Sequence, residues 1–368
     1  MSPPERVAAL LDEGLERGFF AGASALVVSG KETLAERHAG EARVEPVSER
    51  RAAGPDTLWD LASLTKPIAG AALVLSLVSE RTLSLDDEVG RFDDRWKKSF
   101  LEGVSVRRLL AHLGGVVDWF PLYSKGEGRL AYVRTLGELD AAEIPGTKVI
   151  YSCPGYLFLS EIVERVSGAP VDRLFEARVS VPLALSKNLL FSPSLPADLA
   201  RCAGGERDDA TERRMTGERK QKYGGFRQGV VNGQVNDGNA YRRGNGVSLN
   251  AGLFGTAEAA AALGRAWLAR DGRLLPERFF ALATENATTG FGEDRGLGWQ
   301  LASTPGSPGE PLGPAAFGHT GFTGASLFVD PESGRVAVLL TNRLHPDARP
   351  VEMNAFRRRF HEIAAALG

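Results

Sequence analysis

Ser63 and Lys66 are two residues whose types and spacing indicate a catalytic pair. They stand three residues apart near the start of the apolar stretch TLWDLASLTKPIAGAALVLSLVSE, residues 57–80. On a helix, this spacing places both side chains on one face, about 5–6 Å apart at Cβ. A serine hydroxyl attacks a carbonyl only when a base removes its proton, and a lysine is such a base when burial or neighbouring cations keep it neutral. The pair therefore predicts a nucleophile and its partner.

A second interpretation of the same residues stays open at this point. Ser-x-x-Lys is short enough to arise by chance, and a helix N-cap serine followed by a solvated lysine gives the same pattern. Pro67 lacks a backbone N–H and is tolerated only in the first turn of a helix, which favours a helix that begins at Ser63. The rest of the chain must decide between the two.

Composition narrows the class of protein. The 368 residues, 43% hydrophobic and 24% charged, indicate a soluble globular protein with room for two domains. With a net charge of −2, the chain lacks the excess of positive charge that is typical of proteins that bind nucleic acid or an anionic membrane. The only cysteines are Cys153 and Cys202, which excludes a disulfide framework and a cysteine-rich metal site.

The N-terminal sequence MSPPERVAALLDEG bears on the location of the protein. It is charged and amphipathic, and lacks the basic start and apolar run of a signal peptide. No uninterrupted apolar stretch reaches the ~18 residues that a membrane span needs. We therefore expect a cytoplasmic protein, or a periplasmic one if the natural N-terminus has been trimmed.

Strand patterns lie at both ends of the chain and helical patterns between them. The predicted strands are 23–29, 32–38, 298–302, 325–330 and 335–341, and the terminal helices are 2–14 and 351–367. The two ends should pair into one antiparallel sheet flanked by the terminal helices, an α+β fold. We expect residues 1–81 plus 245–368 to form this discontinuous domain, and residues 82–244 to form a mostly helical insertion.

Part of the insertion, residues 201–244, differs in composition from the rest of the chain. It belongs to a stretch rich in Gly, Arg, Asn and Asp that continues to residue 250 and is too long for an ordinary loop, which predicts a lid or an excursion over a site. Acidic and basic residues alternate there, so the sequence predicts a solvated surface rather than a nucleic-acid patch. The charged residues are Glu206, Asp208, Asp209, Arg213, Arg214, Lys220 and Lys222.

Seven ordered motifs carry a resemblance that runs nearly end to end. They are LASLTK (61–66), LLAHLGGV (109–116), YSCPGY (151–156), NDGNA (236–240), NAGLFGTAE (250–258), GLGW (296–299) and FGHTGFTGASLFVDPESGRVAVLLTNRLHP (317–346). Together they resemble the serine hydrolase superfamily of class C β-lactamases, D-alanyl-D-alanine peptidases and related esterases. The resemblance implies the β-lactamase/transpeptidase-like fold. It also implies an active site similar to that of penicillin-binding proteins, which uses no metal and no cofactor.

The resemblance also implies roles for the first two motifs and the tyrosine. Ser63 would be the nucleophile that forms an acyl-enzyme, with Lys66 helping to deprotonate it. Tyr151 would be a phenolate-like base or proton shuttle whose pKa is held down by Lys66.

A third motif, His319-Thr320-Gly321, matches the family's Lys-Thr-Gly, which is His-Thr-Gly in many esterase-like members. It would lie on a strand that lines the site. The backbone N–H groups of Ser63 and Phe322 would hold the oxyanion. We expect His112 and His345 to be structural.

Two departures from the family pattern bear on the substrate. Cys153 stands where the family usually has Asn, and a thiol cannot offer the paired donor and acceptor of an amide to an acylamino group. His319 in place of Lys removes a permanent cation that would hold a substrate carboxylate. Both changes favour a small ester or amide without a required carboxylate. Cys153 is alternatively a redox handle, although an inert buried thiol fits better.

We therefore expect a metal-free serine hydrolase of esterase type that acts on a small-molecule ester or amide, with no nucleic-acid or membrane partner. One alternative keeps the acyl-enzyme but takes a β-lactam or a D-amino-acid peptide. Another is a non-catalytic binding homologue that keeps the pocket and has weakened chemistry.

Overall fold

The strands from the two ends of the chain meet in the middle of one antiparallel sheet. The computed structural model describes residues 2–347 and 349–367. Its seven-stranded sheet has the order β3-β2-β1-β12-β11-β10-β9, and β1 pairs with β12 from Ala23 opposite Thr341 to Ser29 opposite Arg335. The predicted α+β fold with a terminal antiparallel sheet is confirmed. The boundaries at residues 81 and 244 stay a prediction.

The strand bounds differ little from the predicted ones at the chain ends. The large sheet contains β1 (Gly22–Ser29), β2 (Glu32–Arg43), β3 (Arg51–Ala52), β9 (Gln300–Leu301), β10 (Phe317–Thr320), β11 (Ser326–Asp330) and β12 (Arg335–Thr341). A small sheet of β4 (Trp59–Asp60), β8 (Leu253–Gly255) and β5 (Leu189–Phe191) and a pair of β6 (Gly204–Arg207) with β7 (Val230–Asn232) lie outside it. Three of these strands, β5, β6 and β7, fall in the region predicted to be helical or loop.

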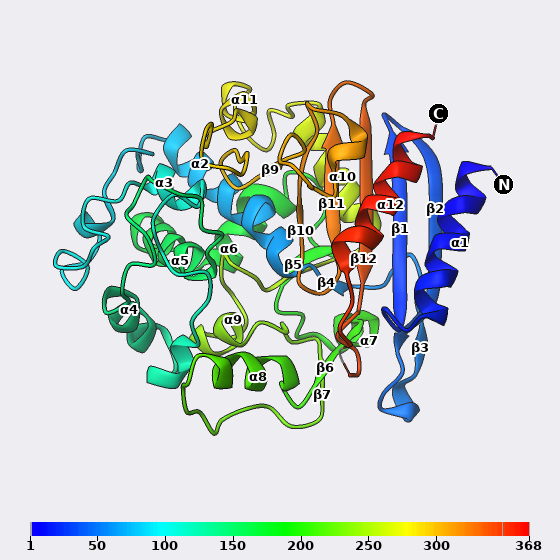
Figure 1. Ribbon diagram of the computed structural model, residues 1–368, viewed down its shortest axis with the longest axis horizontal. Helices are drawn as coiled ribbons and strands as arrows, with labels where there is room; N and C mark the ends of the chain where they lie inside the picture. The colour runs from blue at the N-terminus through cyan, green and yellow to red at the C-terminus, as the bar shows by residue number, and fades with distance from the viewer. Residues whose placement is uncertain (1, 348, 368) are drawn as a thin grey trace.

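Helices cover both faces of the large sheet because its central strands are apolar on both sides (Figure 1). Alternate residues of β12 divide between two cores: Val336, Val338 and Leu340 belong to the larger core, which contains α10, and Ala337 and Leu339 to the core with α1 and α12. This is the two-residue period of a strand buried on both faces.

The α-helices that the structure describes have the following bounds. They are α1 (Pro3–Glu16), α2 (Ala72–Ser79), α3 (Val106–Leu110), α4 (Arg129–Gly137), α5 (Cys153–Ser167), α6 (Val171–Phe175), α7 (Pro196–Arg201), α8 (Ala210–Glu218), α9 (Gly238–Arg243), α10 (Ala257–Leu268), α11 (Arg278–Thr284) and α12 (Met353–Ala365). Figure 1 shows α1 and α12 side by side against the sheet, with α3 to α6 gathered on the opposite side of the molecule.

The segment that carries Ser63 is less regular than a helix beginning at that serine. Residues Ala62–Leu64 form a 3₁₀ turn, Lys66–Ala71 a π-helical turn, and the regular helix α2 begins only at Ala72. Ala62 has φ of +47°, a conformation that non-glycine residues rarely adopt. Residues Ala62–Ser79 together are as long and apolar as a membrane span, but 78% of the segment is buried, as in the core helix of a globular protein.

The charged excursion is not the solvated surface that its composition predicts. Asp209 and Glu206 are buried, at 0% and 3% exposure. Asp209 pairs with Arg227 and Arg242, both at 2.7 Å. Alternating acidic and basic residues give the same sequence pattern whether their side chains face water or pair with one another in the fold. The prediction was therefore wrong for both residues: Asp209 is buried against arginines 18 and 33 residues further along the chain, and the buried Glu206 accepts from the backbone N–H of Thr211 at 2.8 Å.

A second buried charge cluster joins the excursion to α5 and provides a test of the fold. Arg243 lies 2.6 Å from Glu161 and 2.7 Å from Glu164, and both carboxylates are nearly inaccessible to solvent. Removing one member of a buried ion pair leaves the other charge without compensation, which costs about 3–5 kcal/mol. Arg129 also contacts both carboxylates, at 2.7 Å to Glu161 and 3.3 Å to Glu164, so Arg243→Met leaves one half-exposed cation for two buried carboxylates. We therefore expect the variant to lower the free energy of unfolding by about 3 kcal/mol, the lower end of this range, in chemical denaturation.

Arg214→Met is the matched control, because Arg214 pairs with Glu218 across one turn on the exposed face of α8 at 2.6 Å. An exposed pair contributes about 0–1 kcal/mol. Equal losses in the two variants would contradict the assignment of the Arg243 cluster as the stabilising one.

Candidate active site

Ser63 and Lys66 are in direct contact, as their spacing predicts. Lys66 is fully buried, and its Nζ donates to Ser63 Oγ at 2.9 Å, to the Asn250 carbonyl at 3.0 Å and toward Cys153 Sγ at 3.6 Å. An ammonium has three donors, and these three acceptors use all of them. Because Ser63 Oγ accepts from Lys66, its own proton is free to leave toward another base.

Tyr151 lies close to this pair. Lys66 Nζ is 4.9 Å from the centroid of the Tyr151 ring. Burial raises the pKa of Tyr151, while Lys66 and a hydrogen bond with Ser63 oppose the rise. The net direction is upward, so the expectation of a pKa held down by Lys66 was wrong. The reason is that desolvation of the half-buried tyrosine opposes its ionisation more than the neighbouring cation favours it.

The proton on Lys66 is also held more firmly than the sequence predicts. Burial lowers the pKa of Lys66, but the anionic forms of Cys153 and Tyr151 and the nearby Asp237 carboxylate outweigh burial, so that the pKa lies above its ordinary value. Burial raises the pKa of the Cys153 thiol. The three groups titrate as one coupled unit, in which Lys66 is held as an ammonium most firmly when Tyr151 or Cys153 is ionised.

His319 lies in β10 with its ring 5.7 Å from that of Tyr151. Its Nδ1 is 2.7 Å from the Thr320 carbonyl, which requires the proton on Nδ1 and leaves Nε2 as an acceptor. Burial lowers the pKa of His319 well below its usual value, and the cations Arg295 and Lys66 lower it further. The imidazole is therefore neutral, in agreement with the absence of a permanent cation at this position.

The turn after β10 presents the second backbone donor. Gly321 and Gly324 close a turn through a hydrogen bond of 3.0 Å from the Gly324 N–H to the Gly321 carbonyl. In the part of the chain that the structure describes, the Phe322 N–H has no intramolecular acceptor. A Cβ on Gly321 would lie 2.8 Å from the Leu61 carbonyl, so only glycine lets this turn approach the turn that carries Ser63.

A hydrogen bond ties these two turns together. Thr323 Oγ1 donates to the Asp60 carbonyl at 2.8 Å, and the Asp60 carboxylate accepts from the Ala62 N–H at 2.9 Å and from the Asn236 N–H at 2.8 Å. Asp60 thus holds the nucleophile turn, the NDGNA motif and the turn after β10 at fixed separation. Thr320 is partly exposed at the end of β10.

Sequence reasoning missed several residues of the site. Asn250 contributes a backbone carbonyl, which no side-chain pattern reveals. His112, expected to be structural, accepts from the Ser152 N–H at 3.0 Å and has its ring 4.6 Å from that of Tyr151, so it orients the tyrosine. Arg295 has its guanidinium 5.2 Å from the Tyr151 ring. The signal for His112 and Asn250 was their presence inside two of the ordered motifs.

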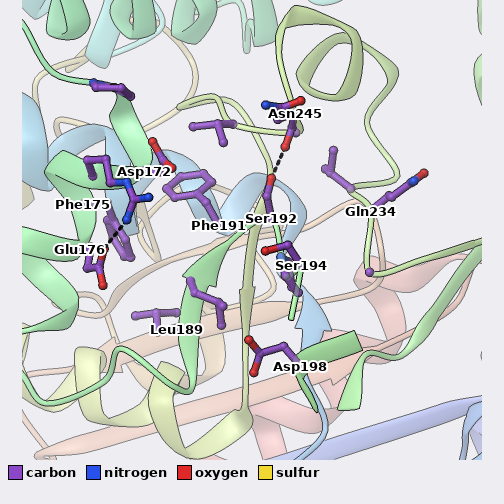
Figure 2. Close-up of a pocket in the computed structure, with 18 of the residues that line it drawn as sticks. Asp172, Phe175, Glu176, Leu189, Phe191, Ser192, Ser194, Asp198, Gln234 and Asn245 are labelled. Atoms are coloured by element: carbon purple, nitrogen blue, oxygen red, sulfur yellow. Dashed lines mark hydrogen bonds and ion pairs between the residues drawn. The ribbon is translucent and has the colours of Figure 1, made fainter. Parts of the chain in front are cut away.

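A large pocket lies away from these residues (Figure 2). It encloses about 1290 Å³ between α6, β5 and the 233–247 segment, and Figure 2 shows Phe191 and Asp172 among its lining residues. None of Ser63, Lys66, Tyr151 and His319 lines it. The candidate active site is identified by the chemistry of its side chains and not by the size of this pocket.

Comparisons with known proteins agree with the geometry. The Beta-lactamase family profile matches residues 7–362. A protein of Escherichia coli K12, provisionally named a D-alanyl-D-alanine carboxypeptidase, is 32% identical over 321 residues, which cover 80% of this chain and 71% of that protein.

Two solved structures are similar in fold. EstCE1, described as a hydrolase with promiscuous acyltransferase activity, has a TM-score of 0.75 at 18% identity and covers 99% of this chain and 98% of its own. A class C β-lactamase has a TM-score of 0.75 at 16% identity and covers 100% of this chain and 96% of its own. The family match spans nearly the whole chain, and the protein belongs to the beta-lactamase family of serine hydrolases.

Proposed function

We propose that this protein is a hydrolase of esterase type, which forms an acyl-enzyme on Ser63 with a small ester or amide and releases the acyl group to water. The observation that carries the proposal is the 2.9 Å contact of the Ser63 hydroxyl with the buried Lys66 ammonium. A hydroxyl oxygen held against a fixed cation is stabilised as it becomes an alkoxide.

In the proposed acylation step, Tyr151 in its phenolate form takes the Ser63 proton, and Ser63 Oγ attacks the substrate carbonyl. Lys66 stays protonated and stabilises both oxygen anions. The N–H groups of Ser63 and Phe322 receive the developing oxyanion, and the tyrosine then returns its proton to the leaving group. Neutral His319 lies beside Tyr151, and among the described residues its Nε2 has no hydrogen-bond partner.

Two features favour an ester over a β-lactam. Cys153 cannot pair with an acylamino group as an amide does, and EstCE1, which shares the fold, is described as a hydrolase with acyltransferase activity. The cytoplasmic location expected from the N-terminal sequence belongs to the same proposal.

The nucleophile is tested with a serine-directed probe. We expect a fluorophosphonate to add one label to the intact protein and a chromogenic short-chain ester to be hydrolysed. Ser63→Ala should abolish labelling and reduce ester turnover by about 10⁴-fold or more, because the remaining groups cannot form the acyl-enzyme. Intact-protein mass and initial rates measure the two effects.

The circular dichroism spectrum of Ser63→Ala should match that of the wild type, so that loss of activity is not loss of fold. Undiminished ester turnover in the variant would exclude the mechanism. Absence of any adduct on the wild-type protein would instead favour the non-catalytic binding homologue.

The pH dependence of turnover follows from the direction of the two pKa shifts. The pKa values of Tyr151 and Lys66 both lie above their ordinary values, so the fraction of enzyme with a phenolate base is small at pH 7 and grows as the pH rises. We expect kcat/KM for a neutral ester to increase through the alkaline range. Tyr151→Phe should remove the increase and lower the rate by about 10²–10⁴-fold.

His319→Gln is the control for this profile. The pKa of His319 is well below its ordinary value, so the imidazole does not change charge near pH 6–7 and the variant should keep the alkaline rise. A profile that instead inflects near pH 6.5 and loses this inflection in His319→Gln would assign the base to the histidine.

A second candidate function is supported by Arg343. Its guanidinium lies 5.4 Å from the ring of Phe322, which is 43% exposed beside the oxyanion turn. Among the residues that the structure describes, no carboxylate pairs with Arg343, and its Nε is buried without a partner. Such a cation would suit a substrate carboxylate, and the Escherichia coli relative is provisionally named a carboxypeptidase. The alternative is therefore a peptide or ester that carries a free carboxylate.

Arg343→Met distinguishes the two candidates. If Arg343 holds a substrate carboxylate, the variant should raise KM for a carboxylate-bearing ester by about 10- to 100-fold, because a charged hydrogen bond is lost. The ratio of kcat/KM for this ester to that for its methyl ester is the measurement. An unchanged ratio would leave the neutral ester as the better assignment.

A further inference from the structure

Arg357 of the C-terminal helix contacts the backbone of the oxyanion turn. It is 5% exposed, and its Nη2 donates to the Gly321 carbonyl at 2.5 Å. Its Nε donates to the Gly324 carbonyl at 3.3 Å, and its Nη1 donates to Asn354 Oδ1 at 2.8 Å. Each of the three nitrogens of the guanidinium is therefore held, two of them by the turn.

The peptide group that Arg357 contacts is the one that matters for the proposed reaction. The Gly321 carbonyl and the Phe322 N–H belong to the same planar peptide unit. Fixing the carbonyl oxygen therefore fixes the direction in which the N–H points. A cationic donor on the oxygen also draws electron density from the nitrogen, which makes the N–H a stronger donor.

The charge of Arg357 is not explained by pairing within the fold. In the described ranges 2–347 and 349–367, no carboxylate lies within ion-pair distance of Arg357. Burial and the neighbouring Arg343 both lower the pKa of Arg357, so a neutral side chain would be easier to bury. The Gly324 N–H already donates to the Gly321 carbonyl at 3.0 Å and closes the turn without the arginine.

We propose that Arg357 is a positioning residue of the oxyanion hole: its charged hydrogen bond to the Gly321 carbonyl orients and polarises the Phe322 N–H toward the substrate oxyanion. Arg357 does not touch the substrate. It acts from behind the turn, through the peptide. The proposal rests on the function proposed above in assigning the Phe322 N–H to the oxyanion.

A spectroscopic test does not depend on the substrate. Labelling glycine with ¹³C at the carbonyl and phenylalanine with ¹⁵N selects the four Gly-Phe peptides of the chain. They are Gly18-Phe19, Gly225-Phe226, Gly290-Phe291 and Gly321-Phe322. In Arg357→Met, the amide proton of Phe322 should move upfield because its peptide loses the polarising cation, and the other three should stay in place.

Kinetics provide the second readout. In Arg357→Met, kcat for the chromogenic ester should fall by about 10- to 100-fold with KM nearly unchanged, since the lost interaction is made only in the transition state. The rate constant for fluorophosphonate labelling of Ser63 should fall in proportion. Arg357→Lys, which keeps the charge but not the fork of donors, should give an intermediate effect.

The controls lie on the same helix. Arg358 pairs with Glu310 at 2.6 Å and Arg359 with Glu13 at 2.6 Å, both on the protein surface. Arg358→Met and Arg359→Met should leave the Phe322 resonance and kcat as in the wild type. If Arg357→Met does not fold, Arg357→Lys carries the same test.

The outcomes separate this proposal from the proposed function. A displaced Phe322 resonance with slower labelling supports the role of Arg357 even if no ester is hydrolysed. A folded variant with an unmoved resonance and an unchanged labelling rate would overturn it while leaving the esterase assignment intact. A lower melting temperature with unchanged rates would make Arg357 a purely structural residue and would overturn it equally.

Discussion

The site depends on an ammonium group held out of contact with water. Lys66 is fully buried in the apolar segment behind the nucleophile, and a buried charge is stable only when every donor has an acceptor. Ser63 Oγ, the Asn250 carbonyl and Cys153 Sγ supply the three acceptors, and they come from three separate segments of the chain. The segments around residues 63, 153 and 250 must therefore be packed together before the charge can be accommodated.

The same requirement explains why the protein joins a sheet to a helical region. The turn after β10 brings the Phe322 N–H to the nucleophile from the sheet, whereas Tyr151 and Cys153 approach from the start of α5. Asp60 connects these parts, since its carboxylate holds both the Ala62 N–H and the Asn236 N–H. The site lies where the large sheet meets the helical region, so its geometry depends on how these two parts pack together.

Much of this arrangement was predictable from sequence, for identifiable reasons. Alternating apolar residues in 335–341 and 325–330 predict strands because burial on a sheet has a period of two. Ser63, Lys66, Tyr151 and the His319 motif could be named because their chemistry resides in side chains within ordered motifs. The roles assigned to them remain a proposal.

What could not be predicted depends on contacts between distant residues. The Asn250 carbonyl leaves no trace in a side-chain pattern, and the 3₁₀ and π turns around Ser63 occur in a segment that hydrogen-bonds to residues 250 and 253, far along the chain. The upward shift of the Tyr151 pKa depends on how completely the fold excludes water. The buried state of Asp209 depends on Arg227 and Arg242, which follow it by 18 and 33 residues.

The pairing of β1 with β12 has a consequence for biosynthesis. Ala23 lies opposite Thr341, so the first hairpin leaves the ribosome long before its neighbouring strand has been translated. At about 5–20 residues per second, the interval is on the order of 15–60 s. Throughout that time the hairpin presents the unpaired backbone N–H and C=O groups of β1 and its apolar faces to other chains, and nascent-chain chaperones would need to shield them until translation is nearly complete.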